Sequence, residues 1–188
     1  MRIAVYGGSF NPPHLGHEAV VETVREEIKP DVFLVIPDCR PPHKELSSNA
    51  PTPEERLEMC RLAFGDTEGV AVSDMEINRG GRSYTSDTIA QLRELYGDAE
   101  IYLVIGSDML LSFTEWHDYE YILDNCTLAV VTRFGDDLEA LERASLGRTV
   151  ILEHTPVVIS SSEIRENLSE QYLSESVYSY IMRKGLYK

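Results

Sequence analysis

Short apolar runs alternate with amphipathic stretches along this chain of 188 residues. The runs at 32–36 (VFLVI) and 101–105 (IYLVI) are apolar without interruption, as in strands that are buried on both faces of a parallel sheet. Amphipathic stretches such as 17–28 follow the strands and predict helices that cover the sheet. We therefore expect an α/β protein with a Rossmann-like, doubly wound parallel sheet and helices on both of its faces.

Six strands and the helices that follow them account for most of the chain. Strands are predicted at 2–8, 31–38, 70–77, 101–108, 127–133 and 149–155, and helices at 17–28, 51–64, 83–97, 160–168 and 175–185. The helix at 51–64 has a clear start, because Thr52 can cap it, Pro53 suits its first position and Glu55 completes a capping box. No repeat or linker divides the sequence, so we expect a single domain, 1–188, on which helices at about 160–188 pack.

The charge balance and the cysteines exclude several classes of partner. Asp and Glu outnumber Lys and Arg by 32 to 17, so the chain lacks the basic footprint that nucleic acid needs. No apolar run approaches the roughly 18–20 residues of a membrane span, and the N-terminus lacks the pattern of a signal peptide. Three dispersed cysteines form no zinc motif. We expect a cytoplasmic protein with no nucleic-acid or membrane partner; the sequence leaves the oligomeric state open, and a homo-oligomer is compatible with it.

The stretch GGSFNPPHLGH, residues 7–17, is the most unusual polar cluster and follows the first predicted strand. Ligands of a doubly wound sheet bind at such strand ends. Gly7 and Gly8 would let the backbone turn sharply and approach a ligand, while His14 and His17 share one face of the next helix's first turn. Because a helix N-terminus offers unpaired N–H groups and a partial positive charge, the stretch predicts a phosphate-binding site.

This stretch is neither of the two common glycine-loop motifs. GxxxxGK[ST] is missing, since His17 stands where the lysine is needed, and GxGxxG is absent. A kinase-like P-loop and a dinucleotide-binding dehydrogenase are therefore disfavoured. The helix dipole lowers the pKa of a histidine here whereas a bound polyphosphate raises it, so the sequence leaves the protonation of both histidines open.

Two signatures, in order, resemble those of the nucleotidylyltransferase superfamily. Residues 7–17 are similar to its GxFxPxHxGH signature, and ISSSEIR at 159–165 is similar to its ISSTxIR signature. In physical terms, the serines at 160–162 supply an N-cap and hydroxyl donors at a helix start, and Arg165 has the fork geometry that suits phosphate. The resemblance implies a Rossmann-like sheet of the nucleotidylyltransferase type.

Narrower motifs resemble one family of that superfamily, the bacterial nicotinate-nucleotide adenylyltransferases. They are PPHK at 41–44, SYTSDT at 83–88, IGSD at 105–108, EW at 115–116, VVTR at 130–133 and VYSYIMRKGLY at 177–187. Arg82 stands where that family often has proline, and Ser162 replaces the usual threonine but keeps the hydroxyl. The motif at 177–187 has apolar residues at helical spacing and predicts packing without chemistry.

The resemblance implies a role for each matching residue. Phosphate contact and catalysis fall to His14, His17, Lys44 and Arg165; ATP binding to Gly7, Gly8, Ser9, Phe10, Gly106, Asp108, Ile159, Ser160, Ser161 and Ser162; and nicotinate mononucleotide binding to Tyr84, Thr85, Trp116 and Arg133. Asp108 is similar to the family's ribose-binding acid, and Trp116 would stack on the pyridine ring. Mg²⁺ is expected to arrive with ATP, without a metal site made by the protein.

The implied reaction is adenylyl transfer from ATP to nicotinate mononucleotide. The attacking phosphate oxygen is already anionic, so positioning and charge stabilisation suffice. Nicotinamide mononucleotide or phosphopantetheine would be alternative acceptors, although the middle motifs are not expected for the latter, and the choice of acid or amide depends on the backbone around Tyr84. A non-catalytic nucleotide-binding module would be expected to lack His14, His17 or Arg165, and all three are present.

Overall fold

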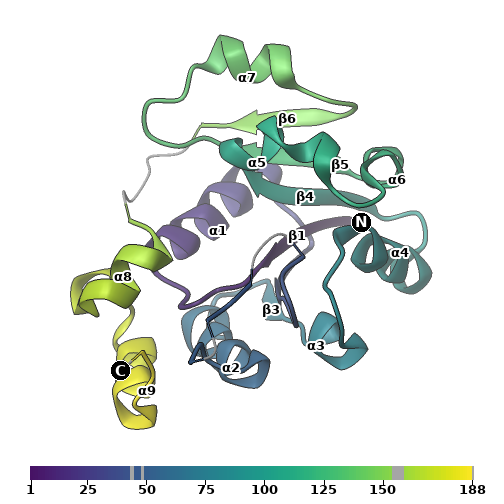
Figure 1. Cartoon of the computed structure of the whole chain (residues 1–188). Helices are drawn as coiled ribbons and strands as arrows, with labels where there is room; N and C mark the ends of the chain where they lie inside the picture. Colours follow the sequence, from purple (N-terminus) through teal and green to yellow (C-terminus); the bar gives the residue numbers. More distant parts are fainter. Residues whose placement is uncertain (43–44, 48, 154–158, 188) are drawn as a thin grey trace. The chain divides into compact units, whose positions relative to one another are not determined.

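The computed structural model describes residues 1–42, 45–47, 49–153 and 159–187 (Figure 1). Its strands are β1 (Arg2–Gly8), β2 (Val32–Pro37), β3 (Val70–Val72), β4 (Glu100–Gly106), β5 (Thr127–Val131) and β6 (Thr149–Leu152). Its helices are α1 (Leu15–Ile28), α2 (Pro53–Phe64), α3 (Met75–Arg79), α4 (Thr85–Tyr96), α5 (Ser107–Leu111), α6 (Tyr119–Asn125), α7 (Leu138–Ala144), α8 (Ser161–Asn167) and α9 (Glu175–Lys184), with short 3₁₀ helices η1 (Phe113–Glu115) and η2 (Glu170–Tyr172). Within these residues, no helix combines the length and apolarity that crossing a membrane requires.

The strands form a six-stranded parallel sheet in the order β3-β2-β1-β4-β5-β6. Arg2 of β1 lies opposite Glu100 of β4, and Leu103 of β4 lies opposite Leu128 of β5. This order, with the chain moving outward in both directions from β1, is that of a doubly wound sheet. The predicted fold class is therefore confirmed.

The predicted strand at 70–77 is wrong over its second half. The strand β3 ends at Val72, and Met75–Arg79 is the helix α3. Asp74 occupies the N-cap position, and its carbonyl oxygen accepts a hydrogen bond of 2.8 Å from the N–H of Asn78. Ser and Asp are common at such positions because they compete with strand pairing, and the alternation at 74–77 concealed this signal.

The contacts within the chain divide it into two compact units, and each is described by itself. The first unit comprises Met1–Tyr6, Val20–Leu34 and Tyr84–Pro156. The second unit comprises Gly7–Ala19, Val35–Ser83 and Val157–Lys188. The expectation of a single domain stays a prediction.

In the first unit, β4, β5 and β6 lie side by side and α7 lies beyond β6 (Figure 1). The helix α4 ends at Gly97, where a positive φ of 53° suits glycine. Arg93, in the last turn of α4, donates hydrogen bonds to the carbonyl oxygens of Gly97, Ala99 and Asn125. These bonds tie the end of α4 to the residue before β4 and to the end of α6.

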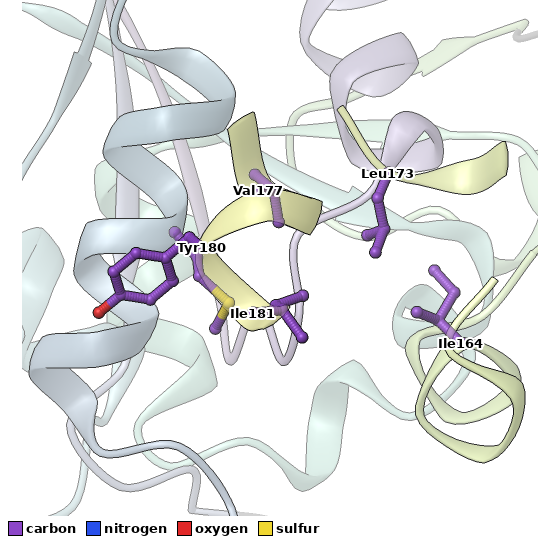
Figure 2. Packing of buried hydrophobic residues seen from close by; sticks show 6 residues of the cluster. Ile164, Leu173, Val177, Tyr180 and Ile181 are labelled. Carbon is purple, nitrogen blue, oxygen red and sulfur yellow. The ribbon is translucent and has the colours of Figure 1, made fainter. Parts of the chain in front are cut away.

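In the second unit, α2 and the closing helices share an apolar cluster. The cluster consists of Met59, Ile164, Leu173, Val177, Tyr180 and Ile181, most of them drawn and labelled in Figure 2. Thr52 caps α2 through the predicted capping box with Glu55. The predicted closing helices are confirmed as α8 and α9.

Candidate active site

The loop after β1 turns at a different residue from the one that the glycines predicted. The strand continues through Gly7 and Gly8, neither of which has a positive φ. The left-handed turn falls on Phe10, with φ 44°, so the expected sharp turn at the glycines is wrong. The Phe10 side chain is 2% exposed and lies against His17 and Phe64, at ring distances of 5.1 and 6.0 Å. This packing of a large apolar ring holds the turn in place.

His14 and His17 lie together at the start of α1, as the sequence predicted. Their ring centroids are 3.8 Å apart. The Nδ1 of His14 accepts a hydrogen bond of 3.1 Å from the N–H of Gly16, and the Nδ1 of His17 accepts one of 3.2 Å from the N–H of His14. Since each Nδ1 is an acceptor, a neutral ring carries its proton on Nε2, where it can be donated to a ligand.

Burial favours the neutral form of His14 in the ligand-free protein. Its side chain is buried, and loss of solvation lowers its pKa from 6.5 to about 4. His14 is therefore neutral at physiological pH and serves as a hydrogen-bond donor rather than a cation in the ligand-free protein.

Gly16 leaves room for the His14 ring. A Cβ at this residue would lie 3.0 Å from two atoms of that ring and 3.6 Å from Cγ2 of Ile159. Gly16 belongs to the first signature and Ile159 opens the second. The two signatures therefore approach each other at this glycine.

Hydrogen bonds also join the two signatures directly. Arg165 donates from Nη1 to the carbonyl oxygen of Asn11 at 2.8 Å, and Ser161 donates from its hydroxyl to the carbonyl oxygen of Pro12 at 3.1 Å. Arg165 also donates from Nη2 to the hydroxyl of Ser162 at 2.9 Å. Segments almost 150 positions apart in sequence thus form one cluster within the second unit.

The Ser160 hydroxyl serves the helix itself. It accepts from the N–H of Glu163 at 3.2 Å and donates to the Glu163 carboxylate at 2.7 Å. The backbone N–H of Ser160 also donates to that carboxylate, at 2.8 Å, which completes a capping box at the start of α8. Hydrogen bonds from Ser160 lower the pKa of Glu163. Of the three predicted serine hydroxyls, Ser160 caps α8, while Ser161 and Ser162 contact Pro12 and Arg165.

In the first unit, Asp108 and Arg133 form an ion pair next to Gly106. The distance from Nη2 of Arg133 to Oδ1 of Asp108 is 3.0 Å. A Cβ at Gly106 would lie 2.6 Å from that same carboxylate oxygen, so glycine leaves room for the pair. Sequence analysis assigned Asp108 to ATP and Arg133 to the mononucleotide; the structure pairs them with each other.

The three remaining residues of the predicted mononucleotide site, Tyr84, Thr85 and Trp116, lie in two places of the first unit. Tyr84 is the N-cap residue of α4 and Thr85 is its first residue, as expected for backbone N–H groups that face an anion. The ring of Tyr84 lies 4.3 Å from that of His117, which the sequence did not single out. Trp116 is half-buried, and its ring lies 4.9 Å from that of Phe113.

Comparison with known proteins identifies the family of the chain. Residues 5–167 match the family model described as Cytidylyltransferase-like. A protein of Fusobacterium nucleatum subsp. nucleatum, described as "Probable nicotinate-nucleotide adenylyltransferase", is 38% identical over 174 residues, which cover 91% of this chain and 89% of the relative. A protein of Gemmatimonas aurantiaca with the same description is 32% identical, and the match covers 100% of this chain and 93% of the relative.

The chain belongs to the cytidylyltransferase-like family. Among solved structures, it is similar to Plasmodium falciparum nicotinic acid mononucleotide adenylyltransferase complexed with NaAD. The TM-score is 0.83 at 20% identity, over 99% of this chain and 97% of that one. At this identity the likeness establishes the fold of the cytidylyltransferase-like chain.

In this cytidylyltransferase-like protein, the loop at 9–14 after β1 is held by a buried arginine that the sequence did not single out. Arg56 of α2 is 0% exposed. It donates to the carboxylate and the carbonyl oxygen of Asp38, at 2.9 and 2.7 Å, and to the carbonyl oxygens of Ser9 and Cys39, at 2.8 and 3.1 Å. The Ser9 hydroxyl donates to the other Asp38 oxygen at 2.6 Å. The available signal was the position of Arg56 beside Leu57, Met59 and Cys60 on the apolar face of α2.

Three further findings concern predicted elements of the site. Lys44 lies outside the described residues, so its role stays a prediction. A cavity of about 590 Å³ in the second unit is lined by Arg82, the residue that replaces the family's usual proline, together with Cys39, Arg40, Pro41, Pro42, Glu45 and Leu46. In the described part of the chain, no group of three or more His, Cys, Asp or Glu side chains could hold a metal ion.

Proposed function

We infer that this protein transfers the adenylyl group of ATP to nicotinate mononucleotide, giving nicotinate adenine dinucleotide and pyrophosphate. One observation carries the inference: Arg165 and Ser161 of the second signature bond directly to Asn11 and Pro12 of the first. The relatives' descriptions as nicotinate-nucleotide adenylyltransferases support the acceptor.

The reaction requires hydrogen-bond donors in fixed positions around the phosphates, and it requires no general base, because the attacking oxygen is already anionic. An anionic phosphate oxygen of the mononucleotide attacks the α-phosphorus of ATP; the new P–O bond forms as the bond to the β-phosphate oxygen breaks and pyrophosphate leaves. His14 and His17, with Nδ1 held as an acceptor, present Nε2–H groups that stabilise the charge on the phosphoryl oxygens. Arg165 and Lys44 add the positive charge.

The first-unit residues hold the nucleosides in this proposal. Asp108 accepts hydrogen bonds from the ribose hydroxyls of ATP, and Arg133 balances its charge until the substrate binds. The N–H groups at the start of α4 bind the nicotinate carboxylate, and the exposed part of Trp116 stacks on the pyridine ring. Mg²⁺ would be carried by the triphosphate oxygens and water, which suits a cation that keeps much of its hydration.

A single assay tests the function and the acceptor together. Purified protein is supplied with ATP–Mg²⁺ and either nicotinate or nicotinamide mononucleotide, and pyrophosphate release is followed. We expect a clear preference for the acid, because only the acid has a carboxylate for the helix N-terminus. Equal rates would contradict the acid preference, and no rate with either would contradict the function.

His17→Ala is the matched variant for this assay. Loss of one donor to the transferring phosphoryl group should lower kcat by about 100-fold, while the midpoint of thermal unfolding changes by only a few degrees. An unchanged kcat in a folded variant would show that His17 does not act on the phosphates.

A further inference from the structure

The end of the chain reaches the first signature. After α9, Gly185 adopts the left-handed conformation with φ 66°, and the N–H of Leu186 returns to the carbonyl oxygen of Ile181 at 3.1 Å. After this turn, Tyr187 lies against the loop that follows β1, and its hydroxyl donates to Oδ1 of Asn11 at 2.6 Å. Sequence analysis expected the motif at 177–187 to contribute packing only.

Asn11 is held from two sides by the C-terminal part of the second unit. Its side chain receives the Tyr187 hydroxyl, and its carbonyl oxygen receives Nη1 of Arg165. The residue is 5% exposed, so water cannot readily replace either bond. The bond to the side chain therefore fixes the amide in one orientation.

Tyr187 is suited to be a permanent donor. Burial is the main cause that raises the pKa of its hydroxyl, so the hydroxyl keeps its proton at any pH at which the protein works. The Tyr187 ring packs at the border of the cluster of Met59, Ile164 and Ile181, which limits its movement. The packing of the ring against this cluster therefore holds the hydroxyl in one position.

A displacement of Asn11 would move both histidines. Only Pro12 and Pro13 separate Asn11 from His14, and prolines transmit a shift because their φ is fixed. The N–H of His14 in turn positions the ring of His17 through Nδ1. Since errors of about 1 Å in a catalytic geometry cost on the order of 100-fold in rate, small shifts of Asn11 would matter.

We propose that Tyr187 is a positioning residue for adenylyl transfer: its hydroxyl holds Asn11, and through Asn11 it holds His14 and His17 in the geometry that acts on the phosphates. The proposal rests on the proposed function. It extends the catalytic apparatus to the last turn of the chain, beyond the two signatures that define the family's resemblance.

The test compares two tyrosines of the same region. Tyr187→Phe removes only the hydroxyl that bonds to Asn11. Tyr180→Phe is the control, because Tyr180 belongs to the same cluster (Figure 2). Among the described residues, its hydroxyl makes no hydrogen bond that corresponds to the one from Tyr187 to Asn11. Both variants keep the ring, so both should fold, which thermal unfolding checks.

For Tyr187→Phe we expect kcat about tenfold below the wild type, with KM for both substrates changed by less than about threefold, and Tyr180→Phe within twofold of the wild type. A purely structural role would lower the unfolding temperature and leave kcat of the folded protein unchanged, and that result would overturn the proposal. Equal losses in both variants would overturn it too. If the wild type itself had no activity, the proposed function would fail instead.

A rescue experiment separates the acceptor from the rest of the side chain. Asn11→Asp keeps an oxygen that accepts from Tyr187, and Arg165 lies close enough to balance its charge. Asn11→Leu has similar size but no acceptor. We expect the Asp variant to retain at least about a third of kcat and the Leu variant to lose as much as Tyr187→Phe. A Leu variant as active as the wild type would contradict the positioning role.

Discussion

Two arginine–aspartate pairs, one in each unit, have nearly the same length and opposite surroundings. Arg56 and Asp38 in the second unit are 2.9 Å apart, with side chains 0% and 9% exposed. Arg133 and Asp108 in the first unit are 3.0 Å apart, with side chains 62% and 41% exposed. The distance between the charges is therefore no guide to what each pair does; burial and the other hydrogen bonds are.

The buried pair is part of a fixed network. Arg56 bonds to the backbone of Ser9, Asp38 and Cys39, so it joins the loop after β1 to the end of β2. Such a network stays in one arrangement because any other leaves a buried charge without a partner. Phosphoryl transfer benefits from this rigidity, since its donors must be in place before the charge develops.

The exposed pair can separate at little cost. Its attraction is screened by water, so it contributes at most about 1 kcal/mol to the free energy of unfolding. Opening the pair would leave Asp108 and Arg133 available for the substrate contacts proposed above. The comparison predicts that substitutions at the buried pair reduce stability, whereas those at the exposed pair change substrate binding alone.

The largest effect is expected for Arg56→Met. The substitution leaves the Asp38 carboxylate buried without its cation and removes the donors to three carbonyl oxygens. Breaking a buried pair on one side costs about 3–5 kcal/mol, which urea unfolding should detect as a lower free energy of unfolding. Activity should fall as well, because the Ser9 backbone loses its support.

Arg61→Met is the control on the same helix. Arg61 is 52% exposed and lies 3.7 Å from Glu58, so its loss should change the free energy of unfolding by less than about 1 kcal/mol. Equal costs at Arg56 and Arg61 would break the distinction between buried and exposed pairs.

The second-largest effect is expected in the pH dependence of the free energy of unfolding, to which His14 contributes. Its folded pKa of about 4 lies below the ordinary value of 6.5, so between these pH values the unfolded chain binds more protons than the folded one. The contribution of His14 to stability is thus unaffected above pH 6.5 and becomes increasingly unfavourable as the pH falls towards 4, by about 1 kcal/mol at pH 5.5.

Unfolding of the wild type and of His14→Gln at several pH values measures this effect. The difference in free energy of unfolding between the two should be constant above pH 7 and should shift in favour of the variant below pH 6. A difference that does not vary with pH would mean that His14 is solvated in the folded protein.

Sequence reasoning predicted the parallel, doubly wound sheet and the proximity of the two histidines because those features follow from local patterns. The apolar runs of β2 and β4 revealed parallel strands, and the capping pattern Thr52–Glu55 revealed the start of α2. The histidines at positions 14 and 17 were expected on one helix start and lie there. Hydrophobic periodicity and helix-capping residues involve neighbours in sequence, so they can be recognised before the fold is known.

What the sequence did not reveal depends on contacts between distant segments. In the sequence, nothing distinguishes Arg56 from an exposed helix residue, and only the structure shows its bonds to Ser9 and Asp38. The sequence likewise predicts a packing role for Tyr187, and only the structure shows the bond from its hydroxyl to Asn11. The position of the turn after β1 also depends on a distant contact. The two glycines predicted a turn at 7–8, but the left-handed residue is Phe10, whose ring packs on Phe64. Tertiary contacts override local propensity at these residues.

The smallest effect is expected for Gly106→Ala, which tests the exposed pair of Arg133 and Asp108. The new methyl group would lie 2.6 Å from Oδ1 of Asp108, at the end of a flexible side chain that can swing away, and the φ of −76° is open to alanine. Gly106 is the N-cap residue of α5, where alanine is less favourable than glycine, so the free energy of unfolding should fall by no more than about 1 kcal/mol. Under the proposed function, KM for ATP should rise by about threefold to tenfold, because the Asp108 carboxylate is displaced from the position proposed to bind ribose. Leu111→Ala, on the same short helix and 69% exposed, serves as the control with unchanged KM. A loss of stability without a change in KM would show that the exposed pair supports the fold, and the contrast with Arg56 and Asp38 would then fail.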